Sequence, residues 1–156
     1  MCPSTTTHTS PRRSVVDVLV DTGAWYALAD RSDRHYKAAR EFYERQAGTA
    51  ALITTDLILA ETFAVLSARL GQPTALTHWG ALREARIPVL APDSVDLEAA
   101  WRIAQDYSDQ SFSFVDCTTF AMMERLGITD AFTFDAHFLL YRFGPGRGQG
   151  FRRHPR

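Results

Sequence analysis

Short runs of apolar, β-branched residues alternate along the chain with longer segments in which apolar positions recur every three or four residues. The short runs are typical of buried strands, and the longer segments are typical of helices that bury one face. We expect strands at residues 15–20, 51–54, 87–90, 130–134 and 150–154. We expect helices at residues 24–30, 33–47, 56–70, 73–85, 94–107, 113–127 and 136–142, the last ones counted with their caps.

Residues that favour helix ends stand at several of these boundaries. Thr55, Ser94 and Ser113 precede helical segments, where a hydroxyl accepts a hydrogen bond from the first turn. Gly71 and Gly127 follow helical segments, where glycine readily ends a helix. The boundaries therefore support the same division into elements as the apolar pattern.

Strands that alternate with helices indicate a mainly parallel sheet with helices on both faces. The sequence thus predicts an α/β fold, a three-layer α/β/α domain with a central sheet of about five strands. In such folds, ligands bind beyond the carboxyl ends of the strands. Functional side chains are expected directly after the strands.

Composition is that of an ordinary globular protein, with 156 residues of which 46% are hydrophobic and 22% charged. Residues 1–14 are polar and Thr-rich, and we expect a disordered tail there, followed by one domain at residues 15–156. No stretch reaches the roughly 18 uninterrupted apolar residues of a membrane span. Two cysteines do not form a disulfide framework, so we expect a cytoplasmic protein that meets no membrane.

Four acidic residues lie near the carboxyl ends of the predicted strands, where parallel sheets bind their ligands. Asp21 directly follows the first predicted strand, and Asp135 directly follows the fourth. Asp116 lies in the first turn of a helix, and Glu61 lies in the second turn of the helix after the second strand. All four side chains can face the same edge of the sheet, which predicts one acidic site.

Helix capping is an alternative explanation for three of these acids. Asp21 and Asp135 each precede a short helix, and Ser113 with Asp116 matches the capping box Ser-x-x-Asp. Glu61 has no such role, because its neighbours one turn away on the helix are apolar. A carboxylate on an apolar face requires compensation, either from an Arg partner or from a metal cation shared with other acids.

A cation shared by carboxylates would be a hard one. Oxygen ligands without His or Cys select Mg²⁺ or Mn²⁺, and the five His and two Cys do not stand at the spacings of a zinc site. Such ions increase the acidity of a bound water and stabilise charge on a phosphate. The four acids therefore predict hydrolysis of a phosphodiester.

Two other acid-based families fit the sequence poorly. A haloacid-dehalogenase-type phosphatase would use Asp17 and Asp21, but three residues separate them where that family has one. Receiver domains also gather acids beyond strand ends. Both families need a late Lys near the phosphate, whereas the only Lys here is Lys37, on an early helix.

Four blocks of sequence resemble the PIN-domain nucleases, and most closely the VapC-like toxins of bacterial toxin–antitoxin systems. The blocks are VLVDTGAWYALAD (18–30), LITTDLILAET (52–62), SFSFVDCTTFAMMERLGITDAFTFDAHF (111–138) and GFRRHP (150–155). By this resemblance, Asp21, Glu61 and Asp116 match the family's first three acids, which coordinate metal. Asp135 matches the fourth acid, which often acts through water. Thr133 matches a small hydroxyl residue that orients a ligand or water, and Gly23 stands where the family often has Ser.

The resemblance implies a PIN-like fold and a Mg²⁺-dependent endoribonuclease in which Mn²⁺ can substitute. It also implies a homodimer and a small cognate antitoxin that covers the acidic groove. A PIN nuclease that processes or degrades RNA without being a toxin is the alternative, as is an RNA-binding module that does not cut. The net charge of −1 does not indicate nucleic acid, but the last 21 residues contain five Arg and no acid, which either contact phosphates or face solvent.

Overall fold

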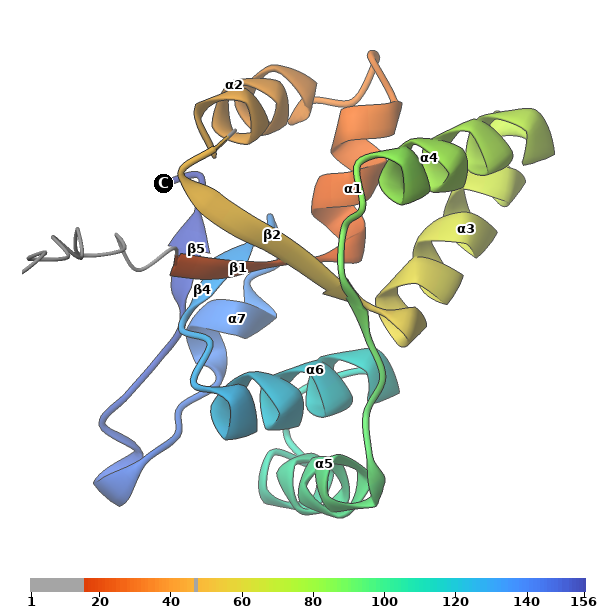
Figure 1. Cartoon of the computed structure of the whole chain (residues 1–156). Coiled ribbons are helices and arrows are strands. Elements are labelled where there is room, and N and C mark those ends of the chain that lie inside the picture. Colours follow the sequence, from red (N-terminus) through yellow and green to blue (C-terminus); the bar gives the residue numbers. More distant parts are fainter. Residues whose placement is uncertain (1–15, 47) are drawn as a thin grey trace, which may run out of the picture.

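The chain alternates strands and helices as its sequence predicts, and Figure 1 shows the resulting arrangement. The computed structural model describes residues 16–46 and 48–156, so the expected tail at residues 1–14 lies outside the described residues. The strands are β1 (Val16–Val20), β2 (Ala50–Thr55), β3 (Val89–Leu90), β4 (Asp130–Phe132) and β5 (Arg152–His154). The helices are α1 (Thr22–Ala29), α2 (Tyr36–Gln46), α3 (Asp56–Leu70), α4 (Gln72–Glu84), α5 (Ser94–Asp106), α6 (Phe114–Leu126) and α7 (His137–Leu140), with a short 3-10 turn at Pro145–Arg147.

The five strands form one sheet in the order β3-β2-β1-β4-β5, and every neighbouring pair is parallel. Helices α1 to α4 lie on one side of this sheet and α5 to α7 on the other (Figure 1). This confirms the three-layer α/β/α fold, with a sheet that is wholly rather than mainly parallel. Since parallel strands begin at one edge and end at the other, β1, β2 and β4 deliver the residues that follow them to a common edge.

Most helix boundaries follow the predicted caps. The Thr55 hydroxyl accepts a hydrogen bond from the Ile58 amide, and Gly71, at a φ of 91°, ends α3. Gly127 ends α6 in the left-handed region, at a φ of 68°. One cap was predicted wrongly: Asp93 rather than Ser94 caps α5, because its carboxylate reaches two amides of the first turn.

Several elements are shorter than the apolar pattern predicts. β3 has two residues, and β4 ends at Phe132 although the apolar pattern continues to Phe134. The Thr133 amide still donates to the His154 carbonyl, but the Thr133 side chain and the Asp135 amide are hydrogen-bonded within the acidic site. Helix α7 has only four residues, within the predicted 136–142.

The core lies on both faces of the sheet. Its largest fully buried side chains include Trp25 on α1, Phe132 on β4 and Phe120 on α6. None of the helices in the described part of the chain is long and apolar enough to cross a membrane. The core thus fixes α1, β4 and α6, the three elements that carry or adjoin most of the acidic residues.

Candidate active site

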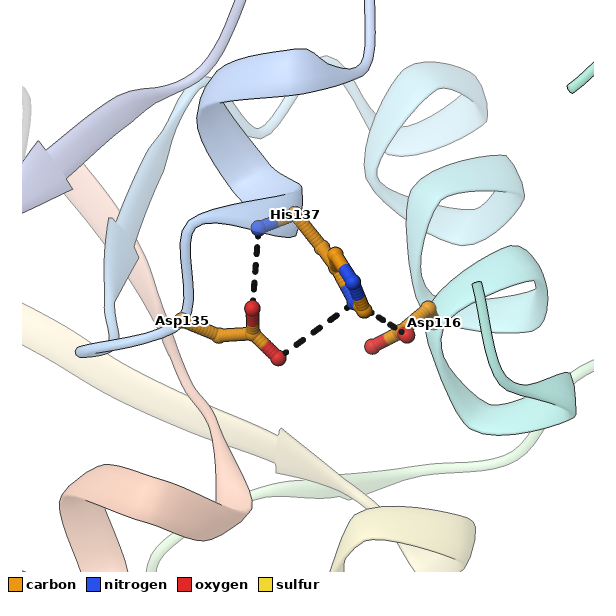
Figure 2. A group of neighbouring side chains, drawn as sticks. All are labelled: Asp116, Asp135 and His137. Carbon is orange, nitrogen blue, oxygen red and sulfur yellow. Dashed lines mark hydrogen bonds and ion pairs between the residues drawn. The ribbon is translucent and has the colours of Figure 1, made fainter. Parts of the chain in front are cut away.

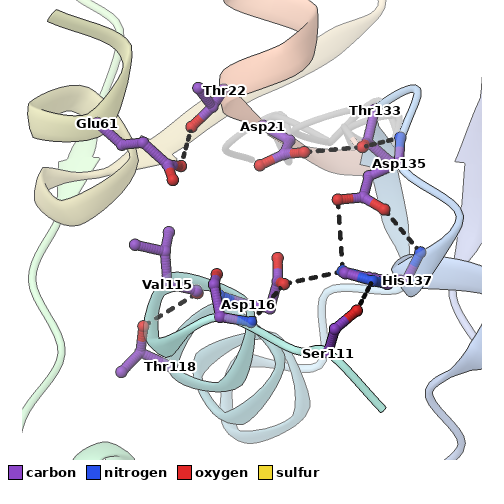
Figure 3. Close-up of polar contacts among 11 residues, drawn as sticks. Asp21, Thr22, Glu61, Ser111, Val115, Asp116, Thr118, Thr133, Asp135 and His137 are labelled. Atoms are coloured by element: carbon purple, nitrogen blue, oxygen red, sulfur yellow. Dashed lines mark hydrogen bonds and ion pairs between the residues drawn. The ribbon is translucent and has the colours of Figure 1, made fainter. Parts of the chain in front are cut away.

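All four predicted acids line one open cleft at the carboxyl edge of the sheet. The cleft has a volume of about 330 Å³, and Figure 3 shows the four carboxylates pointing into it from four different segments. Its walls are Asp21, Thr22, Gly23, Glu61, Val65, Ser111, Ser113, Asp116, Asp135 and His137. The structure therefore brings together residues that lie up to 114 positions apart in sequence, Asp21 and Asp135 being the outermost of the acids.

Asp21 is the most buried of the four acids, with 8% of its surface exposed. It precedes α1, but its side chain makes no capping hydrogen bond, so capping does not explain it. Burial, with smaller contributions from the nearby Asp116 and Asp135 carboxylates, raises the pKa of Asp21 to about 7 despite opposing hydrogen bonds from the Thr133 hydroxyl and the Thr22 amide. This carboxylate lacks the compensation that an ionised group needs in a buried place.

Thr133 joins two of the acids. Its hydroxyl donates a hydrogen bond of 2.8 Å to Asp21 Oδ2 and accepts one of 3.0 Å from the Asp135 amide. Thr133 is fully buried and does not line the cleft, so it touches the acids and not the open space. The geometry supports a positioning role, which differs from direct orientation of a ligand.

Asp116 combines a capping role with a place in the cleft. The capping box is formed, because the Ser113 hydroxyl accepts from the Asp116 amide and Asp116 Oδ2 accepts from the Ser113 amide. The same Oδ2 lies 3.0 Å from Nδ1 of His137. Its side chain is 12% exposed. The capping explanation is therefore correct for Asp116 but accounts for only part of its contacts.

Asp135 is more exposed than Asp116, with 40% of its side-chain surface open to solvent. Its Oδ1 accepts a hydrogen bond of 2.8 Å from the His137 amide at the start of α7. Its Oδ2 lies 3.5 Å from His137 Nδ1. Asp135 thus supports the short α7 and also turns an oxygen toward the cleft.

Glu61 has a hydroxyl partner and no arginine. The Thr22 hydroxyl donates a hydrogen bond of 2.6 Å to Glu61 Oε2, which ties α1 to α3 (Figure 3). Among residues 16–46 and 48–156, no ion pair joins Glu61 to an Arg or a Lys. Val65, one turn along α3, lines the same cleft. The arginine explanation of this half-buried acid is therefore unsupported.

The sequence analysis missed His137, which stands in the middle of the site. It took the five His as unconnected to any metal site, yet ligand atoms of Asp116, Asp135 and His137 lie within 4.8 Å of one another (Figure 2). The signal was the spacing Asp-x-His at the start of a short helix, which places an imidazole beside the preceding carboxylate. Thr22 was also missed, although it follows Asp21 directly.

The donor set suits a divalent cation. The only basic group that contacts the four acids within the described residues is His137, and the buried Asp21 carboxylate resists ionisation without a positive charge. Carboxylate oxygens that converge in this way are the ligands that Mg²⁺ and Mn²⁺ prefer. Asp116, Asp135 and His137 offer ligand atoms within 4.8 Å of one another, and Asp21 and Glu61 line the same cleft.

Two of the five C-terminal arginines have structural partners. Arg152 on β5 forms an ion pair with the largely buried Asp130, and Arg147 pairs with Asp106 on α5. These two side chains are therefore not simply solvated, and they are not free to contact phosphates without giving up a partner.

Comparison with known proteins finds relatives that match most of the chain. The profile of the PIN domain matches residues 18–144. The chain is 30% identical over 122 residues to the 23S rRNA-specific endonuclease VapC20 of two strains of Mycobacterium tuberculosis, which covers 78% of this chain and 91% of that protein.

Solved structures show the same fold. The crystal structure of Mycobacterium tuberculosis VapC20, described as a sarcin-ricin loop cleaving toxin, superposes with a TM-score of 0.73 at 27% identity, over 81% of this chain and 96% of that one. PAE2754 from Pyrobaculum aerophilum shares the fold with a TM-score of 0.56 at 24% identity, over 89% and 91% of the two chains. With the acidic cleft, the wholly parallel sheet and these matches together, the chain belongs to the PIN-domain family and resembles its VapC toxins.

Proposed function

We propose that this protein is a Mg²⁺-dependent endoribonuclease and the toxin of a type II toxin–antitoxin system. The observation that carries the proposal is the convergence of Asp21, Glu61, Asp116 and Asp135 on one cleft, with no Arg or Lys among the described residues paired to them. Such a cluster is costly to keep ionised unless a divalent cation binds there. Mn²⁺ is expected to substitute for Mg²⁺.

Asp21, Asp116, Asp135 and Glu61 would hold the cation in this proposal. When bound, it would neutralise the carboxylates, lower the pKa of a water and stabilise negative charge on the scissile phosphate. Thr133 fixes Asp21 relative to Asp135. Glu61 accepts a hydrogen bond from the Thr22 hydroxyl on Oε2 and lines the same cleft, so it would be the fourth acid around the cation.

RNA is the proposed substrate because of the relatives rather than the cleft. VapC20 is named as a 23S rRNA-specific endonuclease and its structure as that of a sarcin-ricin loop cleaving toxin. At 30% identity over 91% of that protein, we propose the same reaction class and take the sarcin-ricin loop as the first RNA to test.

The proposed partners are a second copy of the chain and a small antitoxin. An apolar groove of about 370 Å³ between α3 and α4 supports a protein partner, since it is lined by Leu59, Ala60, Phe63 and Trp79 with Asp56 at its edge. Trp79 is 42% exposed and Leu76, on the same helix, is 51% exposed. Large apolar side chains left open to solvent commonly mark a protein interface.

A cleavage assay tests the enzymatic part. Asp116→Asn is expected to abolish cutting of a sarcin-ricin loop RNA and of total cellular RNA in Mg²⁺, while the wild type cuts at least one of them. Asp96→Asn serves as a control for the loss of a capping carboxylate: Asp96 completes the capping box of α5 as Asp116 does in α6 and does not line the cleft, although it also forms an ion pair with Arg125. Equal cutting by wild type and Asp116→Asn would refute the proposed site.

A growth assay separates the toxin from the alternative, an RNA-processing or RNA-degrading PIN nuclease that is not a toxin. Expression of the wild type without a partner is expected to arrest growth, and Asp116→Asn is expected not to. Co-expression of the small protein encoded beside the gene should restore growth and co-purify with the chain. Normal growth with abundant, active wild-type protein would favour the alternative.

A further inference from the structure

His137 stands between two of the acids that would hold the cation. Its Nδ1 lies 3.0 Å from Asp116 Oδ2 and 3.5 Å from Asp135 Oδ2, and Figure 2 shows the imidazole between the two carboxylates. The side chain is 24% exposed. This nitrogen therefore belongs to the same donor cluster as the oxygens.

Contacts on several sides hold the ring in this orientation. The His137 amide donates to Asp135 Oδ1, which fixes the start of α7 next to that carboxylate. The ring packs edge-on against Phe112 at 5.1 Å between centroids, and Nε2 lies 3.4 Å from the Ser111 hydroxyl (Figure 3). A ring held in this way presents Nδ1 to the two carboxylates and Nε2 to Ser111.

The spacing suits coordination. In an octahedral site with ligands at about 2.1 Å, adjacent ligand atoms lie about 3.0 Å apart. The distances from Nδ1 to the two carboxylate oxygens are close to that edge length. A cation could therefore bind all three atoms after only small movements of the side chains.

We infer that His137 is a direct nitrogen ligand of the metal ion, and that it makes the site bind Mn²⁺ more tightly than Mg²⁺. The inference rests on the proposed metal-dependent function and deepens it. Imidazole suits first-row transition ions, whereas Mg²⁺ prefers an all-oxygen set. A site of four carboxylates alone has no nitrogen with which to make that distinction.

Ser111 has a part in the same arrangement. Ligation by Nδ1 requires that the ring proton sit on Nε2, and the Ser111 hydroxyl is the acceptor within reach of that atom. Partners on the second ring nitrogen commonly set the tautomer of a metal-bound histidine. Ser111 is thus a positioning residue for His137 rather than a ligand.

Pulsed electron paramagnetic resonance with Mn²⁺ tests the inference directly. Wild-type protein loaded with Mn²⁺ is expected to show nuclear modulation from ¹⁴N, and protein grown with ¹⁵N-histidine is expected to show ¹⁵N instead. In His137→Gln the nitrogen signal should disappear, while His78→Gln, on α4 and away from the cleft, should keep it. The labelled wild type makes the test independent of whether any variant folds.

Binding titrations provide the second readout. The wild type is expected to bind Mn²⁺ several-fold more tightly than Mg²⁺, and His137→Gln should bring that ratio close to one. Mn²⁺ bound to wild type without nitrogen modulation would overturn the inference and leave the proposed function standing. No binding of Mn²⁺ to the wild type at millimolar concentration would overturn the proposed metal site itself.

Discussion

At the scale of single residues, the burial of Asp21 dominates the electrostatics of the site. The sequence placed this acid at a strand end but left helix capping as an equal explanation. The structure removes capping, because the side chain bonds Thr133 and makes no capping contact. The pKa of Asp21 is raised to about 7, and no Arg or Lys among the described residues pairs with it. Burial of its ionised form therefore reduces the stability of the fold.

This burial predicts how stability depends on pH in metal-free buffer. In the unfolded chain Asp21 ionises near pH 3.8, whereas in the folded protein it keeps its proton up to about pH 7. The free energy of unfolding of the wild type therefore falls as the pH rises from about 4 to 7. Asp21→Asn removes that loss, on the order of 4 kcal/mol, and keeps an acceptor for Thr133. Urea unfolding in chelator should show the variant more stable than wild type at pH 7.5, and the difference should shrink at pH 4.5.

Added Mg²⁺ should reverse this order. It is expected to raise the melting temperature of the wild type and to leave Asp21→Asn nearly unchanged, because binding to the folded state adds stability only where a ligand set exists. A variant that is less stable than wild type in chelator at pH 7.5 would show that Asp21 is a structural acid.

Thr133 supports a prediction about positioning. Thr133→Val keeps the shape of the side chain but removes the hydroxyl that joins Asp21 to the Asp135 amide. Loss of such an outer contact typically reduces activity by about 10- to 100-fold. We expect that loss in kcat/KM, and we expect Thr133→Ser to recover most of it. Full activity of Thr133→Val would assign Thr133 to packing alone.

Some site residues were beyond the reach of the sequence. The four acids could be found because strand ends and an apolar helix face are local features. The partner of Glu61 depends on how α1 meets α3, and that crossing places the Thr22 hydroxyl 2.6 Å from the carboxylate. His137 was not predicted because the histidines do not stand at the spacings of a zinc site, although the sequence contains the spacing Asp-x-His at Asp135 and His137.

At the scale of elements, the strand order and helix caps explain which predictions held. Apolar periodicity found the strands and α-helices of the described residues, since most of them bury one face against the sheet or against a neighbouring helix. The apolar pattern was wrong at element ends whose position depends on side-chain hydrogen bonds. Asp93 caps α5 in place of Ser94 because its carboxylate accepts from two amides, and β4 ends at Phe132, directly before the Thr133 side chain that contacts Asp21.

The edge strand β5 is held to β4 by charge. Burial would raise the pKa of Asp130, but hydrogen bonds from Arg152, His154 and Thr129 outweigh it and lower that pKa to about 2. The Asp130 side chain is 9% exposed. Loss of the Asp130 carboxylate would therefore leave the Arg152, His154 and Thr129 side chains without their shared acceptor.

This pair predicts a stability loss at low pH. A lowered folded pKa gives stability that is fully present above about pH 4 and is lost as the pH falls toward 2. Asp130→Asn should cost about 2 kcal/mol at pH 7 and progressively less below pH 4, measured by urea unfolding. Asp106→Asn, which disturbs the exposed pair with Arg147, should change stability by less than about 1 kcal/mol. Equal effects of the two substitutions would contradict the role given to Asp130.

At the scale of the whole molecule, a parallel sheet collects segments from across the chain at one edge. The α/β class and the common edge could be predicted because both follow from the order of elements. The choice of RNA, the partner and the apolar groove between α3 and α4 could not, because they depend on surface shape and on a second molecule. The choice of RNA as the substrate is proposed from the similarity to VapC20.

The most direct test of the central claim is the chemistry of the cut ends. If the acidic cleft uses a metal ion and a water to hydrolyse RNA, the products carry 5′-phosphate and 3′-hydroxyl ends, and excess chelator stops the reaction. Mass spectrometry of the fragments from a sarcin-ricin loop RNA, with Asp116→Asn as the control, gives both answers in one experiment. Products that end in 2′,3′-cyclic phosphate, or cutting that continues in chelator, would contradict the account.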